Sequence, residues 1–219
     1  MLGLFKKTST NFLKFQKRNF NVKSNNYETF VPKELSQFLD TLHRNNADNH
    51  ENCMALREKN HKENIFCYRD DTKEIRQTEW KANVIPDNLK KRHVELTGPG
   101  NDPKMVINAM NSNADCYMLD IEDSMSPSWE NVVSAHKNIG LVARGDLIHD
   151  TGEKVYKVTN DSPPTLLVRA RGLHMFEENV VNNDGQPIQA TLFDIGTHLF
   201  NNALFILFTK EGPSYINPV

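Results

Sequence analysis

The chain has 219 residues, of which 38% are hydrophobic and 25% charged, a balance typical of one or two soluble globular domains. No run approaches the roughly 18 to 20 consecutive apolar residues of a membrane-spanning helix, which excludes a transmembrane protein. A net charge of −2 gives no general attraction to nucleic acid, and the 3 cysteines are too scattered for a disulfide framework.

Residues 1–24 differ from the rest of the chain, because they contain basic residues but no acidic ones. Lysine and arginine are interspersed with leucine and phenylalanine, so basic and apolar residues can segregate onto opposite faces of a helix. This composition is typical of a mitochondrial transit peptide. The alternative is a disordered basic tail. We therefore expect a mitochondrial protein, with a cytosolic or peroxisomal location as the alternatives.

A helical region is expected over residues 28–92. Apolar residues recur at helical spacing from Leu35 to Leu42, which predicts an amphipathic helix that begins after Pro32. Residues 45–62 are rich in asparagine, glutamate and lysine and predict a solvated helix or connector.

Strand and helix signals alternate from residue 93 to the C-terminus. Strands are expected at residues 94–97, 116–121, 165–168 and 215–216. Helix starts are expected at Asp102–Pro103, at Ser126–Pro127 and at Thr191, which forms a capping-box pattern with Asp194. This order predicts parallel βαβ units and the α/β class. Between the second helix and the third strand, β-formers on both sides of a turn-rich centre predict an inserted hairpin at about residues 145–162.

Three carboxylates follow the second predicted strand, where parallel α/β proteins collect reactive groups. Asp120, Glu122 and Asp123 lie within four residues, a density that indicates a metal, a metal-bound water or arginine partners. Acidic residues are also favoured at the N-terminus of a following helix, so a capping role is the alternative.

Two arginines follow the third predicted strand. Arg169 and Arg171 are two residues apart and so share one face of an extended chain. Because a guanidinium can hold a carboxylate through two hydrogen bonds, the pair suits an oxo-acid substrate. Internal ion pairs with the acids after the second strand are the alternative. His174 is interpreted as a structural residue.

Five strings of residues occur in a characteristic order and spacing. They are Val94–Pro99, Lys104–Ala109, Asp120–Ser124, Val168–His174 and Leu192–Asp194. Together they closely resemble malate synthase, and the resemblance corresponds to the first part, less than half, of the family's usual chain. It implies that residues 93–219 form the first strands of a TIM (β/α)8 barrel, which is incomplete. It also implies that residues 28–92 form an N-terminal helical clasp.

The resemblance implies condensation of acetyl-CoA with glyoxylate, followed by hydrolysis to malate and CoA, in the glyoxylate cycle. Arg169 matches the family's catalytic arginine, which polarises the glyoxylate aldehyde together with magnesium. Asp120, Glu122, Asp123 and Arg171 match the surroundings of the substrate and of the magnesium-bound waters. The family's direct magnesium ligands and general-base aspartate come from later segments without a counterpart here, so we expect this chain alone to be inactive.

Three hypotheses follow for the function of the chain. It is the N-terminal segment of a malate synthase, or a catalytically dead truncated paralogue that packs on a full-length homologue as a regulatory module. The third hypothesis is a small binder of a carboxylic acid that uses Arg169 and Arg171. We favour the first, because the sequence shows no replacement cap for the exposed edge of a half-barrel.

Overall fold

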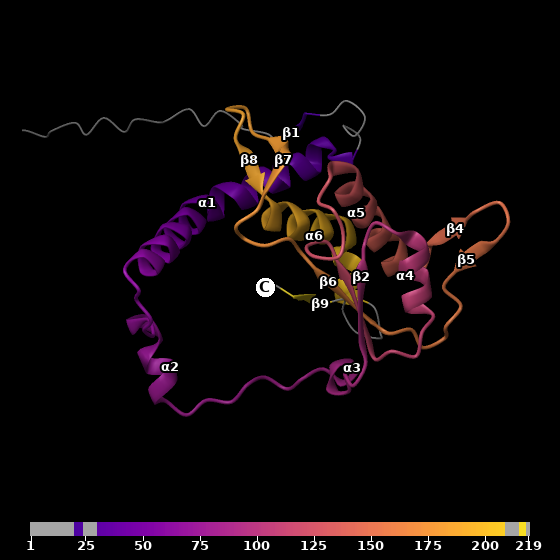
Figure 1. Cartoon of the computed structure of the whole chain (residues 1–219), viewed down its shortest axis with the longest axis horizontal. Helices are drawn as coiled ribbons and strands as arrows, with labels where there is room; N and C mark the ends of the chain where they lie inside the picture. The colour runs from indigo at the N-terminus through magenta and orange to yellow at the C-terminus, as the bar shows by residue number, and fades with distance from the viewer. Residues whose placement is uncertain (1–19, 24–29, 209–214, 218–219) are drawn as a thin grey trace, which may run out of the picture.

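The computed structural model describes residues 20–23, 30–208 and 215–217 and shows a mixed α/β protein (Figure 1). The helices are α1 (Lys33–Lys62), α2 (Lys73–Gln77), α3 (Asp87–Lys90), α4 (Pro103–Met110), α5 (Trp129–Arg144) and α6 (Ala190–Phe208), with a 3-10 turn at Asp70–Thr72. The strands are β1 (Asn21–Val22), β2 (Glu95–Pro99), β3 (Cys116–Asp120), β4 (Ile148–Asp150), β5 (Val155–Lys157), β6 (Thr165–Arg169), β7 (Phe176–Val181), β8 (Pro187–Gln189) and β9 (Tyr215–Asn217). The prediction of the α/β class is confirmed. The described strands form open sheets and no closed barrel.

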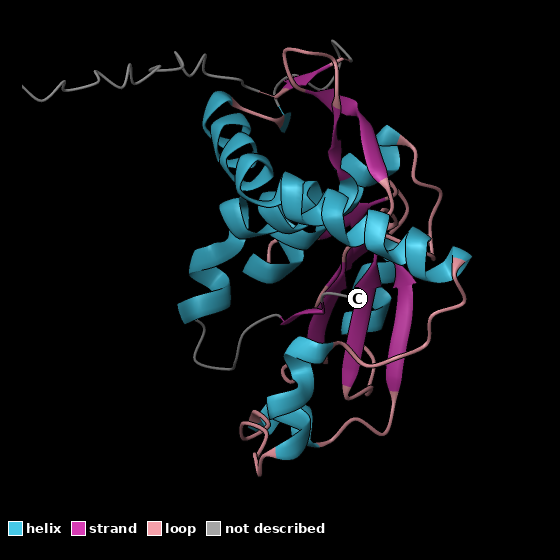
Figure 2. Ribbon diagram, turned by 90° about the vertical axis from the view of Figure 1, so that its left-hand side faces the viewer, coloured by secondary structure: helices cyan, strands magenta, loops and turns pink. Residues whose placement is uncertain are grey.

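The central sheet contains four parallel strands in the order β2-β3-β6-β9, which lie side by side in Figure 2. These are the four strands that the sequence predicts. Their register aligns Pro99, Asp120, Arg169 and Asn217 across the carboxyl edge of the sheet. This edge therefore brings Asp120 next to Arg169, although they are far apart in the sequence.

One hydrophobic core lies between this sheet and the helices α4 and α5. Alternate residues of β3 and β6 enter it, as the pleat of a strand requires. Its fully buried members include Tyr117 and Leu119 from β3, Val106 and Ile107 from α4, and Ala135 and Ile139 from α5. Burial of each large aliphatic side chain contributes about 2 kcal/mol, so this core fixes the sheet against its helices.

A second core joins the N-terminal half of α1, the start of α5, the β7–β8 hairpin and α6. Phe20, Leu35, Trp129, Val180 and Phe193 are buried in it. The strand β1 pairs with β7, so residues 20–22 belong to the fold. Residues 1–19, most of the expected transit peptide, lie outside the described residues.

The predicted helix starts have mixed outcomes. Asp102 caps α4 as predicted. The prediction that Ser126 caps the next helix is wrong, because α5 begins two residues after Pro127 and the Ser128 hydroxyl accepts from the backbone N–H of Asn131 at 3.4 Å. The Asn131 side-chain amide donates to the Ser126 carbonyl at 3.0 Å, so the Ser126 segment forms the approach to the helix.

The capping box predicted at the start of α6 is also wrong. Thr191 lies inside the helix, where its hydroxyl donates to the backbone carbonyl of Arg171 at 2.5 Å. Asp194 accepts from the guanidinium of the same arginine. A buried guanidinium is a stronger partner for a carboxylate than a neutral backbone N–H, so tertiary contacts replace the local cap.

Two segments extend from this body. The predicted hairpin is confirmed as β4 and β5, which project to one side (Figure 1). The C-terminal half of α1 continues through α2 to α3 in a wide arc away from the sheet (Figure 1), and almost all residues from 51 to 95 are exposed. None of the helices in the described ranges has the length and apolar character to cross a membrane.

Candidate functional site

The guanidinium of Arg169 lies among three carboxylates at the carboxyl edge of the parallel sheet. Its Nη1 atom lies 2.7 Å from Asp123 Oδ2 and 3.6 Å from Asp120 Oδ2, and its Nη2 atom contacts Glu122 Oε2. The structure therefore brings together Arg169 and all three acids that the sequence singles out, as arginine partners. One positive charge faces three negative ones, so the cluster keeps a net negative charge.

Asp120 organises the turn that carries the other two acids. Its Oδ1 atom accepts from the backbone N–H groups of Glu122 at 2.8 Å and Asp123 at 3.2 Å. Its Oδ2 atom accepts from the Ser124 hydroxyl at 2.8 Å. These bonds cap the turn after β3 and not the helix α5, which has its own cap. Asp120 is thus a buried acceptor that fixes where the two other carboxylates stand.

Arg169 is largely but not fully buried, with 20% of its side chain exposed. Burial lowers the pKa of Arg169, but the hydrogen bond to Asp123 and the charges of Asp120 and Glu122 raise it more, so the net shift is upward. Among the described residues, the buried Nε atom of Arg169 has no hydrogen-bond partner. One donor of the guanidinium is therefore buried and unsatisfied.

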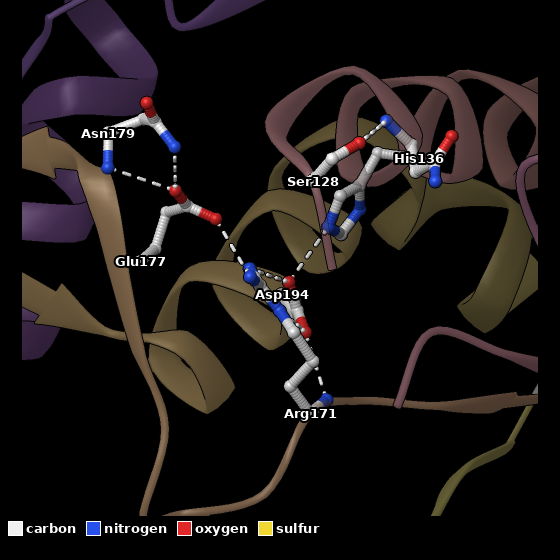
Figure 3. A network of polar contacts seen from close by, with 7 residues as sticks. Ser128, His136, Arg171, Glu177, Asn179 and Asp194 are labelled. Atoms are coloured by element: carbon white, nitrogen blue, oxygen red, sulfur yellow. Dashed lines mark hydrogen bonds and ion pairs between the residues drawn. The ribbon is translucent and has the colours of Figure 1, made fainter. Parts of the chain in front are cut away.

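Arg171 does not join this cluster. The expectation that the two arginines direct their side chains to one place is wrong, because Arg171 is buried in a separate network beneath α5 and α6 (Figure 3). Its Nε and Nη2 atoms donate to the two oxygens of Asp194 at 3.0 and 2.9 Å. Its Nη1 atom donates to Glu177 Oε2 at 2.7 Å. With all three nitrogens engaged and 2% exposure, its guanidinium is occupied by internal partners.

His136 completes the network around Asp194. Its Nε2 atom lies 3.1 Å from Asp194 Oδ1. Burial raises the pKa of Asp194, but the Arg171 charge and the His136 hydrogen bond outweigh burial and lower the pKa to about 2. Asp194 is therefore ionised at neutral pH and can only accept, so the His136 Nε2 atom must carry a hydrogen.

His174 lies beside the carboxylate cluster. A Cβ atom placed on Gly172 would stand 2.6 Å from His174 Cε1 and 3.1 Å from Glu122 Oε1, so these two side chains flank the same glycine. The glycine thus permits a close approach of the imidazole to the acid. The sequence places His174 after the third strand together with Arg169, and its interpretation as a structural residue stays a prediction.

The sequence also missed Glu177, His136, Thr191 and Asp194 as partners of Arg171. The available signal was the Thr191 and Asp194 pair, which lies at a spacing that fits a capping box equally well.

No group of three or more histidine, cysteine, aspartate or glutamate side chains within the described ranges is arranged to hold a metal ion.

The fold and the Arg169 cluster define the class of protein. It is an α/β protein with an open parallel sheet, and at the carboxyl edge of this sheet an arginine is held by carboxylates. No family model matches the chain. Comparison with curated proteins is more informative. The malate synthase of Myxococcus xanthus is 38% identical over 148 residues, which are 68% of this chain and 27% of that protein.

Two further relatives agree. The bifunctional glyoxylate cycle protein of Caenorhabditis elegans is 39% identical over 154 residues, which are 69% of this chain and 16% of that protein. The glyoxysomal malate synthase of Candida tropicalis is 33% identical over 194 residues, which are 85% of this chain and 35% of that protein. The chain is therefore a homologue of malate synthase, as its five strings predict, and it spans 16–35% of the length of these three relatives.

Proposed function

We propose that this chain supplies the glyoxylate-binding arginine of a malate synthase-like protein of the glyoxylate cycle. The observation that carries the proposal is the Arg169 guanidinium at the carboxyl edge of the sheet, with Nε free of hydrogen bonds among the described residues. A permanently charged, oriented donor stabilises negative charge as it develops on an aldehyde oxygen. Asp120, Glu122 and Asp123 hold that donor in place.

The proposal includes the architecture of a longer protein. Residues 93–219 would be the first strands of a TIM barrel and residues 28–92 an N-terminal clasp. The remaining strands would supply the general base for acetyl-CoA and the magnesium ligands. The described residues do not fit a magnesium site by themselves, so no step is assigned to the metal here.

The test joins this chain to the remaining part of the Myxococcus enzyme and measures glyoxylate-dependent release of CoA from acetyl-CoA. Arg169→Lys should lower kcat by about two to three orders of magnitude, because a lysine loses the planar donor set of the arginine. Arg144→Lys at the end of α5 is the matched control and should keep the parent rate. Circular dichroism confirms that each chimera is folded. A folded Arg169→Lys chimera with parent kcat would remove Arg169 from the mechanism.

A second candidate function is an interaction module that packs on a full-length homologue. The observation in its favour is the apolar surface on the arc from α1 to α3, where Phe66, Trp80 and Val84 are 89%, 68% and 87% exposed. Large apolar side chains that gather in one exposed patch mark protein-interaction surfaces.

We also propose a mitochondrial location, based on the basic and acid-free composition of residues 1–24. Because Phe20 is buried and β1 pairs with β7, any cleavage that leaves the fold intact would fall before residue 20.

A further inference from the structure

Two side chains of α6 hold the backbone of the segment that carries Arg169. The Asp194 carboxylate accepts from the backbone N–H of Arg171 at 2.9 Å, and the Thr191 hydroxyl donates to the backbone carbonyl of the same residue at 2.5 Å. Both backbone polar groups of Arg171 are therefore bonded to one face of one helix. We call Thr191 and Asp194 the α6 clamp.

The clamp acts two residues after the functional arginine. On the other side, the backbone N–H of Ile121 donates to the carbonyl of Arg169 at 3.1 Å. Between these two anchors lies only Ala170, which is buried. The backbone of Arg169 is thus fixed by β3 from one direction and by α6 from the other.

The position of this backbone decides where the guanidinium stands. Asp120, Glu122 and Asp123 are fixed separately, by the turn that Asp120 organises after β3. A guanidinium can meet three carboxylates at once only if its own backbone is held in register with that turn. A small displacement of a functional group lowers activity strongly even when its chemistry is intact.

We propose that Thr191 and Asp194 are positioning residues for Arg169, acting through the backbone of Arg171. The clamp also explains why the sequence places threonine and aspartate three residues apart inside the first turns of α6, where they form no capping box. The inference rests on the proposed function only for the identity of the ligand that Arg169 meets.

The test uses the 219-residue chain and NMR detection of the Arg169 Nε–Hε group, whose signal is assigned by its loss in Arg169→Lys. Thr191→Val keeps the shape of the side chain but removes the bond to the Arg171 carbonyl. Exchange of the Arg169 Hε with solvent should accelerate by about fivefold, which corresponds to the loss of one hydrogen bond. Thr191→Ser keeps the hydroxyl and should restore the parent rate.

Thr197→Val is the matched control. Thr197 is fully buried in the same helix, and its hydroxyl has no hydrogen-bond partner among the described residues. It should therefore leave the Arg169 exchange rate unchanged. Equal rates in Thr191→Val and Thr197→Val would overturn the proposal, since the threonine would then be a packing residue only. If Thr191→Val does not fold, Thr191→Ala replaces it, because alanine also removes the hydroxyl. Faster Arg169 exchange in Thr191→Ala than in Thr191→Ser supports the clamp, and equal exchange in the two variants overturns it.

A titration with glyoxylate separates this inference from the proposed function. A shift of the Arg169 signal on addition of glyoxylate supports the ligand assignment. No shift would count against that assignment, while the comparison of the threonine variants would still decide the role of the clamp.

Discussion

At the scale of single residues, Arg171 and Arg169 show how burial changes the use of the same side chain. Arg171 has every guanidinium nitrogen bonded to Asp194 or Glu177 and is closed to ligands. Arg169 keeps partial exposure and an unpaired donor. The first therefore stabilises the fold, whereas the second stands in a net negative cluster at the carboxyl edge of the sheet.

Removing the Arg171 guanidinium should destabilise the chain strongly. Arg171→Met leaves two buried carboxylates without their cation, and we expect a loss of about 3–5 kcal/mol in the free energy of unfolding. Urea denaturation followed by circular dichroism measures this loss. Arg69→Met, which removes an exposed ion pair with Asp71, is the control and should hardly change the midpoint. A midpoint for Arg171→Met equal to that of the control would show that the buried network contributes nothing.

At the scale of elements, the contact between α5 and α6 is a buried polar seam. His136 faces Asp194, and one helical turn further along α6, His198 receives a hydrogen bond from the Asn202 amide at 3.2 Å. Gly140 lies opposite, where a Cβ would stand 3.4 Å from Asn202 Oδ1. Gly140 therefore lies at the contact between the two helices.

This seam should make stability depend on pH. Burial, followed by repulsion from His136, lowers the pKa of His198 from 6.5 to about 4. In the unfolded chain, His198 therefore binds a proton near pH 6.5, whereas in the folded chain it binds this proton only near pH 4. The stability from this group is complete above pH 6.5 and is lost as the pH falls towards 4. Between pH 7 and 5 the loss should be about 2 kcal/mol.

Urea denaturation at the two pH values measures the effect. His198→Gln should remove the His198 part of the pH dependence, while His61→Gln, a substitution at an exposed histidine of α1, should keep it. If the parent and His198→Gln lose stability equally on acidification, His198 is not the titrating group.

The elements that the sequence predicts are those with local signals. Four parallel strands, the Asp102 cap and the β4–β5 hairpin follow from apolar runs and turn residues within a few positions. The meeting of Asp120 with Arg169 also follows, because both end adjacent parallel strands. The buried ion pairs of Arg171 could not be predicted from the sequence. Its partner Glu177 lies in strand β7, which the sequence did not predict, and its partner Asp194 lies in a helix whose first turn resembles a capping box.

At the scale of the whole molecule, neither of the two described cores includes a residue of the arc from the C-terminal half of α1 to α3. Phe66, Tyr68, Ile75, Trp80 and Val84 are all exposed there. The chain spans at most 35% of the three relatives described above, and the exposed apolar side chains of the arc are the surface of the proposed interaction module.

The two tryptophans can report whether this surface becomes covered. Trp80 is 68% exposed on the arc, whereas Trp129 is 5% exposed in the second core. The variant Trp129→Phe leaves only Trp80 to emit, and in a dilute monomer iodide should quench this emission. The variant Trp80→Phe leaves only Trp129, whose emission iodide should hardly change. If the arc docks on another copy or on a full-length homologue, Trp80 should become protected as the concentration of that partner rises, in parallel with the mass from light scattering. Protection of Trp80 in a monomer at every concentration would instead mean that the arc folds back on its own chain, which would leave the interaction module without its surface.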